Sequence, residues 1–81
     1  MSDAKPQVTI YSTPSCHFCH LAKDFFNEKN VAYTEINVAG NPDKINEMVE
    51  KSGQRGVPVI IIGDELILGY DKPKIVQLLG L

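Results

Sequence analysis

The sequence predicts an α/β domain with the element order β-α-β-α-β-β-α, in which three helices flank a four-stranded mixed sheet. Three observations lead to this prediction. Runs of β-branched residues alternate with segments whose apolar residues recur at helical spacing. Glycine, proline and asparagine mark the borders between these segments. Gly63-Asp64 separates the last two strands by two residues, as in a tight hairpin. At 81 residues, we expect one domain over 1–81.

The first half of the chain is typical of two parallel strands joined by a helix. Val8-Thr9-Ile10-Tyr11 is β-branched and aromatic, which predicts a strand. The turn Ser12-Thr13-Pro14-Ser15 can cap the helix that follows, and Asn30 is a suitable stop. That helix carries an apolar stripe of Phe18, Leu21, Ala22, Phe25 and Phe26. A second strand is predicted over Val31–Val38, and the crossover should be right-handed. Its residues on one face are Thr34, Ile36 and Val38.

The second half predicts a helix, a hairpin and a final helix. Asn41-Pro42 matches an N-cap followed by proline at the first helical position, and Gly53 suits the end of that helix. The apolar stripe of this helix is Ile45, Met48 and Val49. Val57–Ile62 is apolar on both faces, which predicts a central strand, and Glu65–Leu68 is its antiparallel partner. Lys72-Pro73 opens a helix that carries Ile75, Val76, Leu78 and Leu79.

The composition excludes several classes of protein. The net charge is -2 and the basic residues are scattered, which argues against partners such as nucleic acid or an anionic membrane. The longest apolar run, Val57–Ile62, is far shorter than the ~20 residues of a membrane span, and the first residues lack a signal-peptide core. Two cysteines are too few for a disulfide-rich scaffold or a four-thiolate zinc site. We therefore expect a cytoplasmic, monomeric protein.

Both cysteines lie in one segment, Cys16-His17-Phe18-Cys19-His20, between the first strand and the first helix. Two intervening residues at a helix start bring the sulfur atoms close enough to bridge or to share a metal ion. Cys16 would lie at the helix N-terminus, where free N–H groups and the helix dipole favour its thiolate. Cys19 is expected to be more buried and suited to attack a mixed disulfide at Cys16. The motif beside a β-α-β unit predicts a redox pair.

Other interpretations of this segment stay open on the residues alone. The two cysteines could be buried structural thiols. Cys16-x-x-Cys19-His20 also matches the c-type haem attachment motif, although haem attachment needs an export signal in most systems and a distal ligand. The cysteines and one histidine could hold zinc or copper(I), but a complete site would then need a dimer. We expect no bound metal and no tightly bound cofactor.

Further candidate residues lie near this motif or in two turns. A protonated His17 would stabilise the Cys16 thiolate, although the residue could equally be a solvent-facing spacer. An exposed Phe18 would contact a partner, whereas His20 is expected on the helix surface. Val57-Pro58 precedes an apolar strand, and because proline cannot donate to the ladder we expect Pro58 as the first strand residue. Gly69-Tyr70-Asp71 is a turn whose aspartate is either an N-cap or a ligand-binding group.

Taken together, these residues resemble the glutaredoxin branch of the thioredoxin fold, over about Gln7 to Leu79. The motifs that carry the resemblance are, in order, Val8-Thr9-Ile10-Tyr11-Ser12 before Cys16-His17-Phe18-Cys19, then Gly56-Val57-Pro58, then Gly69-Tyr70-Asp71. The resemblance implies a thioredoxin-like (glutaredoxin) fold and a thiol–disulfide oxidoreductase that reduces protein or glutathione mixed disulfides. Cys16 would be the nucleophile and Cys19 the resolving thiol.

The resemblance also implies a site for the substrate or for glutathione as co-substrate. The Val57–Pro58 bond would be cis, with Pro58 facing Cys16. Val57 would pair with the glutathione backbone, and Asp71 would pair with its γ-glutamyl end. The implied binding residues are Thr13, His17, Phe18, Gln54, Val57, Pro58, Gly69, Tyr70 and Asp71.

The chain departs from the pattern of glutathione-using members at several positions. Those members usually have lysine in place of Thr13, proline in place of His17, and tyrosine in place of Phe18. They often have threonine in place of Gly56 and a small residue in place of Tyr70. The missing lysine removes a cation for a glutathione carboxylate, and Tyr70 could crowd the groove. An aromatic residue there is more similar to redoxins that thioredoxin reductase reduces, including those that feed ribonucleotide reductase. The electron donor stays open, as does an iron–sulfur cluster shared across a dimer.

Overall fold

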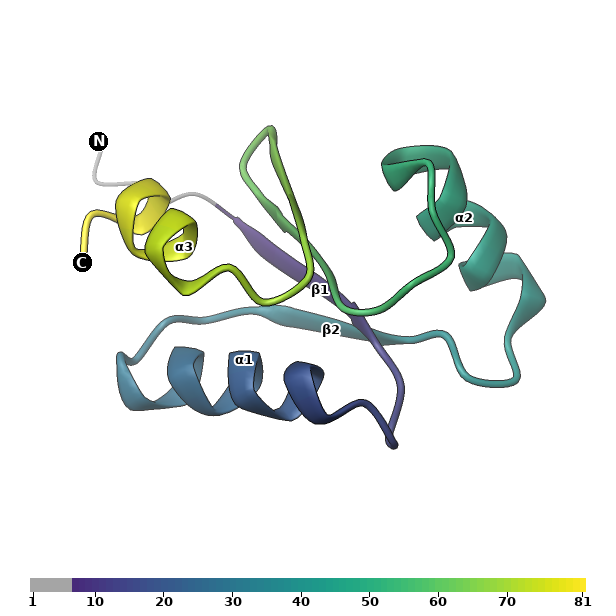
Figure 1. Ribbon diagram of the computed structural model, residues 1–81, viewed down its shortest axis with the longest axis horizontal. Helices are drawn as coiled ribbons and strands as arrows, with labels where there is room; N and C mark the ends of the chain where they lie inside the picture. Colours follow the sequence, from purple (N-terminus) through teal and green to yellow (C-terminus); the bar gives the residue numbers. More distant parts are fainter. Residues whose placement is uncertain (1–6) are drawn as a thin grey trace.

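The computed structural model describes residues 7–81 and confirms the predicted order of elements (Figure 1). Helices α2 and α3 lie at opposite ends of the molecule's long axis in this view. The elements are β1 (Val8–Ser12), α1 (His17–Glu28), β2 (Thr34–Asn37), α2 (Pro42–Ser52), β3 (Val59–Ile62), β4 (Glu65–Leu68) and α3 (Lys72–Leu79). No helix in this part of the chain is long and apolar enough to cross a bilayer.

The four strands form one mixed sheet in the order β2-β1-β3-β4. Strands β1 and β2 are parallel, as the helical crossover between them requires, while β3 is antiparallel to both β1 and β4. Ile10, Ile60 and Ile67 stand side by side across the three strands β1, β3 and β4. The predicted central position of β3 is therefore confirmed.

The sheet is covered on both faces, and each face has its own apolar cluster. One cluster joins the sheet to α1 and α3, and it includes the two phenylalanines that the sequence assigns to the core, Phe25 and Phe26. The other cluster joins the opposite face to α2 through Met48, which is fully buried. Since residues alternate between faces along a strand, Ile10 packs in the first cluster and Tyr11 in the second.

The ends of the helices follow the local chemistry of the sequence. Asn41 caps α2 and accepts a hydrogen bond from the Lys44 N–H, with proline at the first helical position. Gly53 ends α2 in the left-handed conformation with φ 76°. Helix α1 ends two residues before Asn30, which adopts φ 57°. Each of these residues was a predicted cap or stop.

Two strand boundaries predicted from the sequence are wrong. The predicted strand Val31–Val38 is shorter, because the Val31 N–H donates to the Phe26 carbonyl at the end of α1 and is not free for the sheet. Thr34 is exposed because β2 is an edge strand. The predicted strand Val57–Ile62 begins at Val59, so Pro58 precedes the strand instead of opening it; proline has no N–H to donate to a ladder.

Candidate active site

The two cysteines lie at the N-terminus of α1, where the sequence places them. Cys16 is the N-cap residue, and its Sγ accepts a hydrogen bond from the Cys19 N–H at 3.1 Å. The two residues form a disulfide with their Cα atoms 5.2 Å apart, within the normal range for such a bond. A helix N-terminus presents unpaired N–H donors, so this environment stabilises a thiolate on Cys16 once the bridge is reduced.

The two sulfur-bearing residues differ in their access to solvent. Cys16 is partly exposed, whereas Cys19 is 0% exposed, which confirms the expected difference in burial. An external thiol or disulfide can therefore reach the chain at Cys16 and not at Cys19. This asymmetry matches a nucleophile with a resolving partner behind it.

The register of the sheet brings three predicted site segments to one end. Tyr11 pairs with Val59 and Val59 pairs with Leu68, so β1 ends where β3 begins and β4 ends. The cysteine loop, the Val57–Pro58 segment and the turn at Gly69 therefore adjoin the same end of the sheet. The Gly69 N–H donates to the Pro58 carbonyl at 2.9 Å, which ties the second segment to the third.

The Val57–Pro58 peptide bond is cis, as the resemblance implies. Pro58 is buried and Val57 is half-buried. Gln54 belongs to the loop that leads to this bond, and its Nε2 donates to the Gly56 carbonyl at 3.5 Å. Gln54 is half-buried and Gly56 is exposed.

The aromatic and histidine side chains of the motif lie on the surface. Phe18 is 58% exposed, and its ring packs edge-on against the exposed His17 ring with centroids 5.6 Å apart. His20 is exposed, as expected, and its Nε2 lies 2.8 Å from the Pro14 carbonyl. The Thr13 carbonyl accepts the Cys16 N–H at 3.2 Å. These contacts shape the loop that carries Cys16.

The turn after β4 places its two side chains differently. Tyr70 is half-buried with its ring 6.5 Å from the Phe25 ring, against the cluster that joins α1 and α3. Burial, with a smaller contribution from Glu28, raises the pKa of Tyr70. Asp71 is the N-cap of α3, and its Oδ1 accepts the Lys74 N–H at 3.4 Å. The N-cap alternative for Asp71 is therefore realised, while its role toward a ligand stays a prediction.

A polar cluster beside this loop was not predicted from the sequence. Ser12 is fully buried, and its hydroxyl donates to Glu35 Oε2 at 2.8 Å. Lys23 donates to the same oxygen at 2.7 Å. The one sequence feature that points to it is a serine at the end of a strand rich in β-branched and aromatic residues, because a buried hydroxyl needs a partner.

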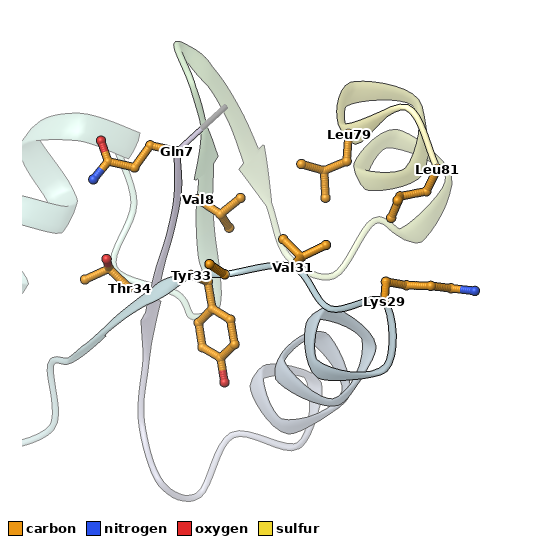
Figure 2. A pocket seen from close by; sticks show the side chains of 9 residues that line it. Gln7, Val8, Lys29, Val31, Tyr33, Thr34, Leu79 and Leu81 are labelled. Carbon is orange, nitrogen blue, oxygen red and sulfur yellow. The ribbon is translucent and has the colours of Figure 1, made fainter. Parts of the chain in front are cut away.

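A surface pocket of about 420 Å³ lies away from the cysteines (Figure 2). Val8, Val31 and Leu79 turn toward one another in it, from β1, the loop before β2 and α3. Val8 begins β1, whereas the cysteine loop follows Ser12 at the other end of that strand. The pocket is thus no part of the dithiol site. Over residues 7–81, no three His, Cys, Asp or Glu side chains are grouped closely enough to hold a metal ion.

Comparison with known proteins supports the interpretation of Cys16 and Cys19 as the redox pair of a thioredoxin-like fold. The family model described as Glutaredoxin matches residues 8–67. Glutaredoxin 3 of Escherichia coli strain K12 is 39% identical over 64 residues, covering 79% of this chain and 77% of that protein. A crystal structure of the thioredoxin-like protein BC3987 superposes with a TM-score of 0.83 at 29% identity, covering 90% of this chain and 100% of that chain.

A second solved structure is that of the glutaredoxin-like protein NrdH-redoxin from Escherichia coli. It is 30% identical to this chain, with a TM-score of 0.76, and the match covers 89% of this chain and 93% of that one. These similarities confirm the thioredoxin-like fold. The chain belongs to the glutaredoxin family, as a thiol–disulfide redoxin whose CxxC dithiol is Cys16 and Cys19.

Proposed function

We propose that this redoxin reduces protein disulfides and glutathione mixed disulfides, with Cys16 as the nucleophile, Cys19 as the resolving thiol and glutathione as the electron donor. The observation that carries the proposal is the asymmetric pair at the start of α1. Cys16 is accessible and accepts an N–H hydrogen bond at its sulfur, while Cys19 is fully buried behind it.

The reaction begins with the reduced protein. The Cys16 thiolate attacks one sulfur of the substrate disulfide, the substrate S–S bond breaks, and the departing thiolate takes a proton from water. A mixed disulfide now joins Cys16 to the substrate. Cys19 loses its proton to water, and its sulfur attacks the Cys16 sulfur and releases the second substrate thiolate. The substrate has gained two electrons, and the protein holds the Cys16–Cys19 bridge that the structure contains.

Two molecules of glutathione would reverse this oxidation. The first thiolate attacks Cys16, which breaks the bridge and frees Cys19 as a thiol. The second attacks the glutathione sulfur of the mixed disulfide, which leaves as glutathione disulfide and restores the Cys16 thiolate. In our proposal Val57 and Pro58 hold the peptide backbone of glutathione, and Asp71 holds its γ-glutamyl end. The hydrogen bond from Gly69 to the Pro58 carbonyl supports this, because it joins the two segments that would share the ligand.

Six further residues belong to the proposed binding surface. Thr13, His17 and Phe18 belong to the segment that carries Cys16, and Gln54 precedes the Val57–Pro58 segment. Gly69 allows the turn at φ 83°, and Tyr70 follows it. The half-buried Tyr70 ring packs on Phe25, and this supports glutathione use because part of the ring is directed to the core.

Thioredoxin reductase is the alternative electron donor, and a specific similarity favours it. The NrdH-redoxin from Escherichia coli is a glutaredoxin-like protein with a thioredoxin-like activity profile. This chain shares 30% of its residues with that redoxin over most of both lengths. Thioredoxin reductase would reduce the Cys16–Cys19 bridge directly, without glutathione.

Two coupled assays separate these donors. NADPH consumption is followed with a small disulfide substrate, either with glutathione and glutathione reductase or with thioredoxin reductase alone. Turnover in the first system alone supports the proposal, and turnover in the second alone refutes glutathione as the donor.

Intact-mass measurement tests the dithiol mechanism. The Cys19→Ser protein should hold a substrate adduct at Cys16, and the Cys16→Ser protein should hold none.

A further inference from the structure

One carboxylate oxygen connects both sides of the segment that carries the cysteines. Glu35 Oε2, on β2, accepts the Ser12 hydroxyl at 2.8 Å and the Lys23 ammonium at 2.7 Å. Ser12 is the last residue of β1 and is fully buried, and Lys23 belongs to α1. The three side chains thus join two neighbouring strands to the active-site helix on the face that α1 covers.

The two donors bracket the dithiol in the chain. Ser12 lies four residues before Cys16, and Lys23 lies four residues after Cys19. Because residues four apart on a helix lie on the same face, Lys23 and Cys19 belong to the same side of α1. Cys19 and Lys23 are both largely buried there, the Lys23 side chain being 17% exposed. Glu35 therefore anchors the strand that leads into the cysteine loop and the helix turn that follows it.

The charge on Glu35 keeps this connection intact at neutral pH. The hydrogen bond from Lys23 lowers the pKa of Glu35 most, followed by the bond from Ser12; the charges of Lys23 and His20 add to these effects, while burial opposes them. An ionised carboxylate between a hydroxyl and an ammonium makes two charge-assisted hydrogen bonds, which are shorter and stronger than neutral ones. The cluster is therefore ionised and hydrogen-bonded at neutral pH, with the Glu35 side chain 39% exposed to solvent.

We propose that Glu35 is a positioning residue for the resolving step, an inference that rests on the proposed function. Attack by Cys16 on an external disulfide does not need a fixed geometry, because the substrate can adjust its approach. Attack by Cys19 does need one, because its buried sulfur must approach the Cys16–substrate disulfide in line. Neither sulfur can move freely to reach this geometry, since both belong to the same loop and helix. By fixing both ends of that segment, Glu35 holds Cys19 in reach of Cys16 after the substrate has bound.

The chain offers a matched control in a second carboxylate. Glu47, on α2, accepts the Tyr11 hydroxyl at 2.6 Å through Oε2 and the Lys44 ammonium at 3.3 Å through Oε1. Its bond to Tyr11 also joins β1 to a helix, but on the opposite face of the sheet and to a helix without cysteines, while Lys44 lies on the same helix as Glu47. Removal of this carboxylate should cost stability without slowing resolution.

Stopped-flow reaction with one equivalent of the aromatic disulfide DTNB separates the two steps. Attack by Cys16 releases one equivalent of coloured thiolate, and resolution by Cys19 releases the second. The reduced wild-type protein is compared with Glu35→Ala, Glu35→Gln, Lys23→Met and Glu47→Ala, each checked for folding by circular dichroism. Glutamine keeps an oxygen that can accept both donors but loses the charge, so it should retain the position of the helix in part, whereas alanine removes both bonds.

We expect Glu35→Ala to slow the second release by roughly tenfold, since a displacement of a reacting group by about 1 Å can lower a reaction rate by up to ~100-fold. The rate of the first release should change by less than about twofold. Lys23→Met should also slow the second release, and it serves if Glu35→Ala does not fold. Glu47→Ala should match the wild type, and Glu35→Gln should fall between the wild type and Glu35→Ala. Equal second-phase rates in Glu35→Ala or Lys23→Met and the wild type would overturn the inference, as would a glutamine variant as slow as its alanine counterpart. A wild-type protein that releases only one equivalent would instead contradict the proposed dithiol mechanism.

Discussion

Replacement of Tyr11 by phenylalanine should destabilise the protein at neutral pH and remove a loss of stability at alkaline pH. Tyr11 is fully buried, and its hydroxyl donates to Glu47 Oε2 at 2.6 Å. Burial raises the pKa of Tyr11 to about 12, and the hydrogen bond and negative charge of Glu47 add to that effect. The folded protein therefore holds the phenol proton more tightly than the unfolded chain does.

The sign of the pH dependence follows from this raised pKa. The stabilisation is fully present below the ordinary tyrosine pKa of about 10 and is lost as the pH rises toward about 12. Between about pH 8 and about pH 11, a shift of this size corresponds to about 1.4 kcal/mol of lost unfolding free energy. We expect about 1 kcal/mol, because the Glu47 side chain is 33% exposed and water screens its charge. Phenylalanine has no proton to lose.

The size of the effect at neutral pH follows from the hydrogen bond. A hydrogen bond to a charged group contributes about 1.5–3 kcal/mol. The exposure of Glu47 to water places the effect of Tyr11→Phe at or just below the lower end of this range, at about 1–1.5 kcal/mol. At about pH 11 the wild type has lost most of this advantage, so the difference between the two proteins should nearly vanish.

Urea unfolding of the oxidised proteins, followed by circular dichroism, measures this difference, since the disulfide keeps the cysteines from titrating. Wild type, Tyr11→Phe and Glu47→Gln are compared at neutral and alkaline pH. Glu47→Gln should retain the tyrosine but show a smaller alkaline loss, because the negative charge is gone. A difference between wild type and Tyr11→Phe that stays constant or grows with pH would refute the reasoning.

Three further outcomes are expected. Glu35→Gln should make the fall of Tm at acid pH less steep, because Lys23 and Ser12 lower the pKa of Glu35 in the folded protein. The resulting stabilisation is present above the ordinary glutamate pKa of about 4.3 and is lost as the pH falls through the folded-state pKa. An equally steep fall of Tm in the variant would contradict this. Gly53→Ala should lower the free energy of unfolding by about 1 kcal/mol, because the residue has φ 76°, which strains a residue with a Cβ atom, while no other atom crowds the position. Turnover should not change, and an unchanged midpoint of urea unfolding would contradict this prediction. Asp71→Ala should lose about 0.5–2 kcal/mol of stability with the helix cap and also raise the KM for glutathione, and an unchanged KM would remove Asp71 from the binding site.

Local chemistry made the element order and the helix ends predictable. Asn41 and Gly53 act within one turn of the chain, so their effects do not depend on distant residues. The strand boundaries were less predictable. Val31 is β-branched and fits a strand, but its N–H is bound by the end of α1, and this competition between partners cannot be read from propensity.

The dithiol was predictable because all of its determinants are adjacent in the chain. A turn, two cysteines and a helix start place one sulfur at the N-cap and the other one turn inside, whatever the rest of the fold does. The Glu35 cluster could be decided only by tertiary structure. Ser12, Lys23 and Glu35 come from three elements, and they meet only when the crossover through α1 brings β2 beside β1. The sequence predicted that Cys19 is more buried than Cys16, but its complete burial follows from the packing of α1 on the sheet. In our proposal this burial decides which sulfur meets the substrate.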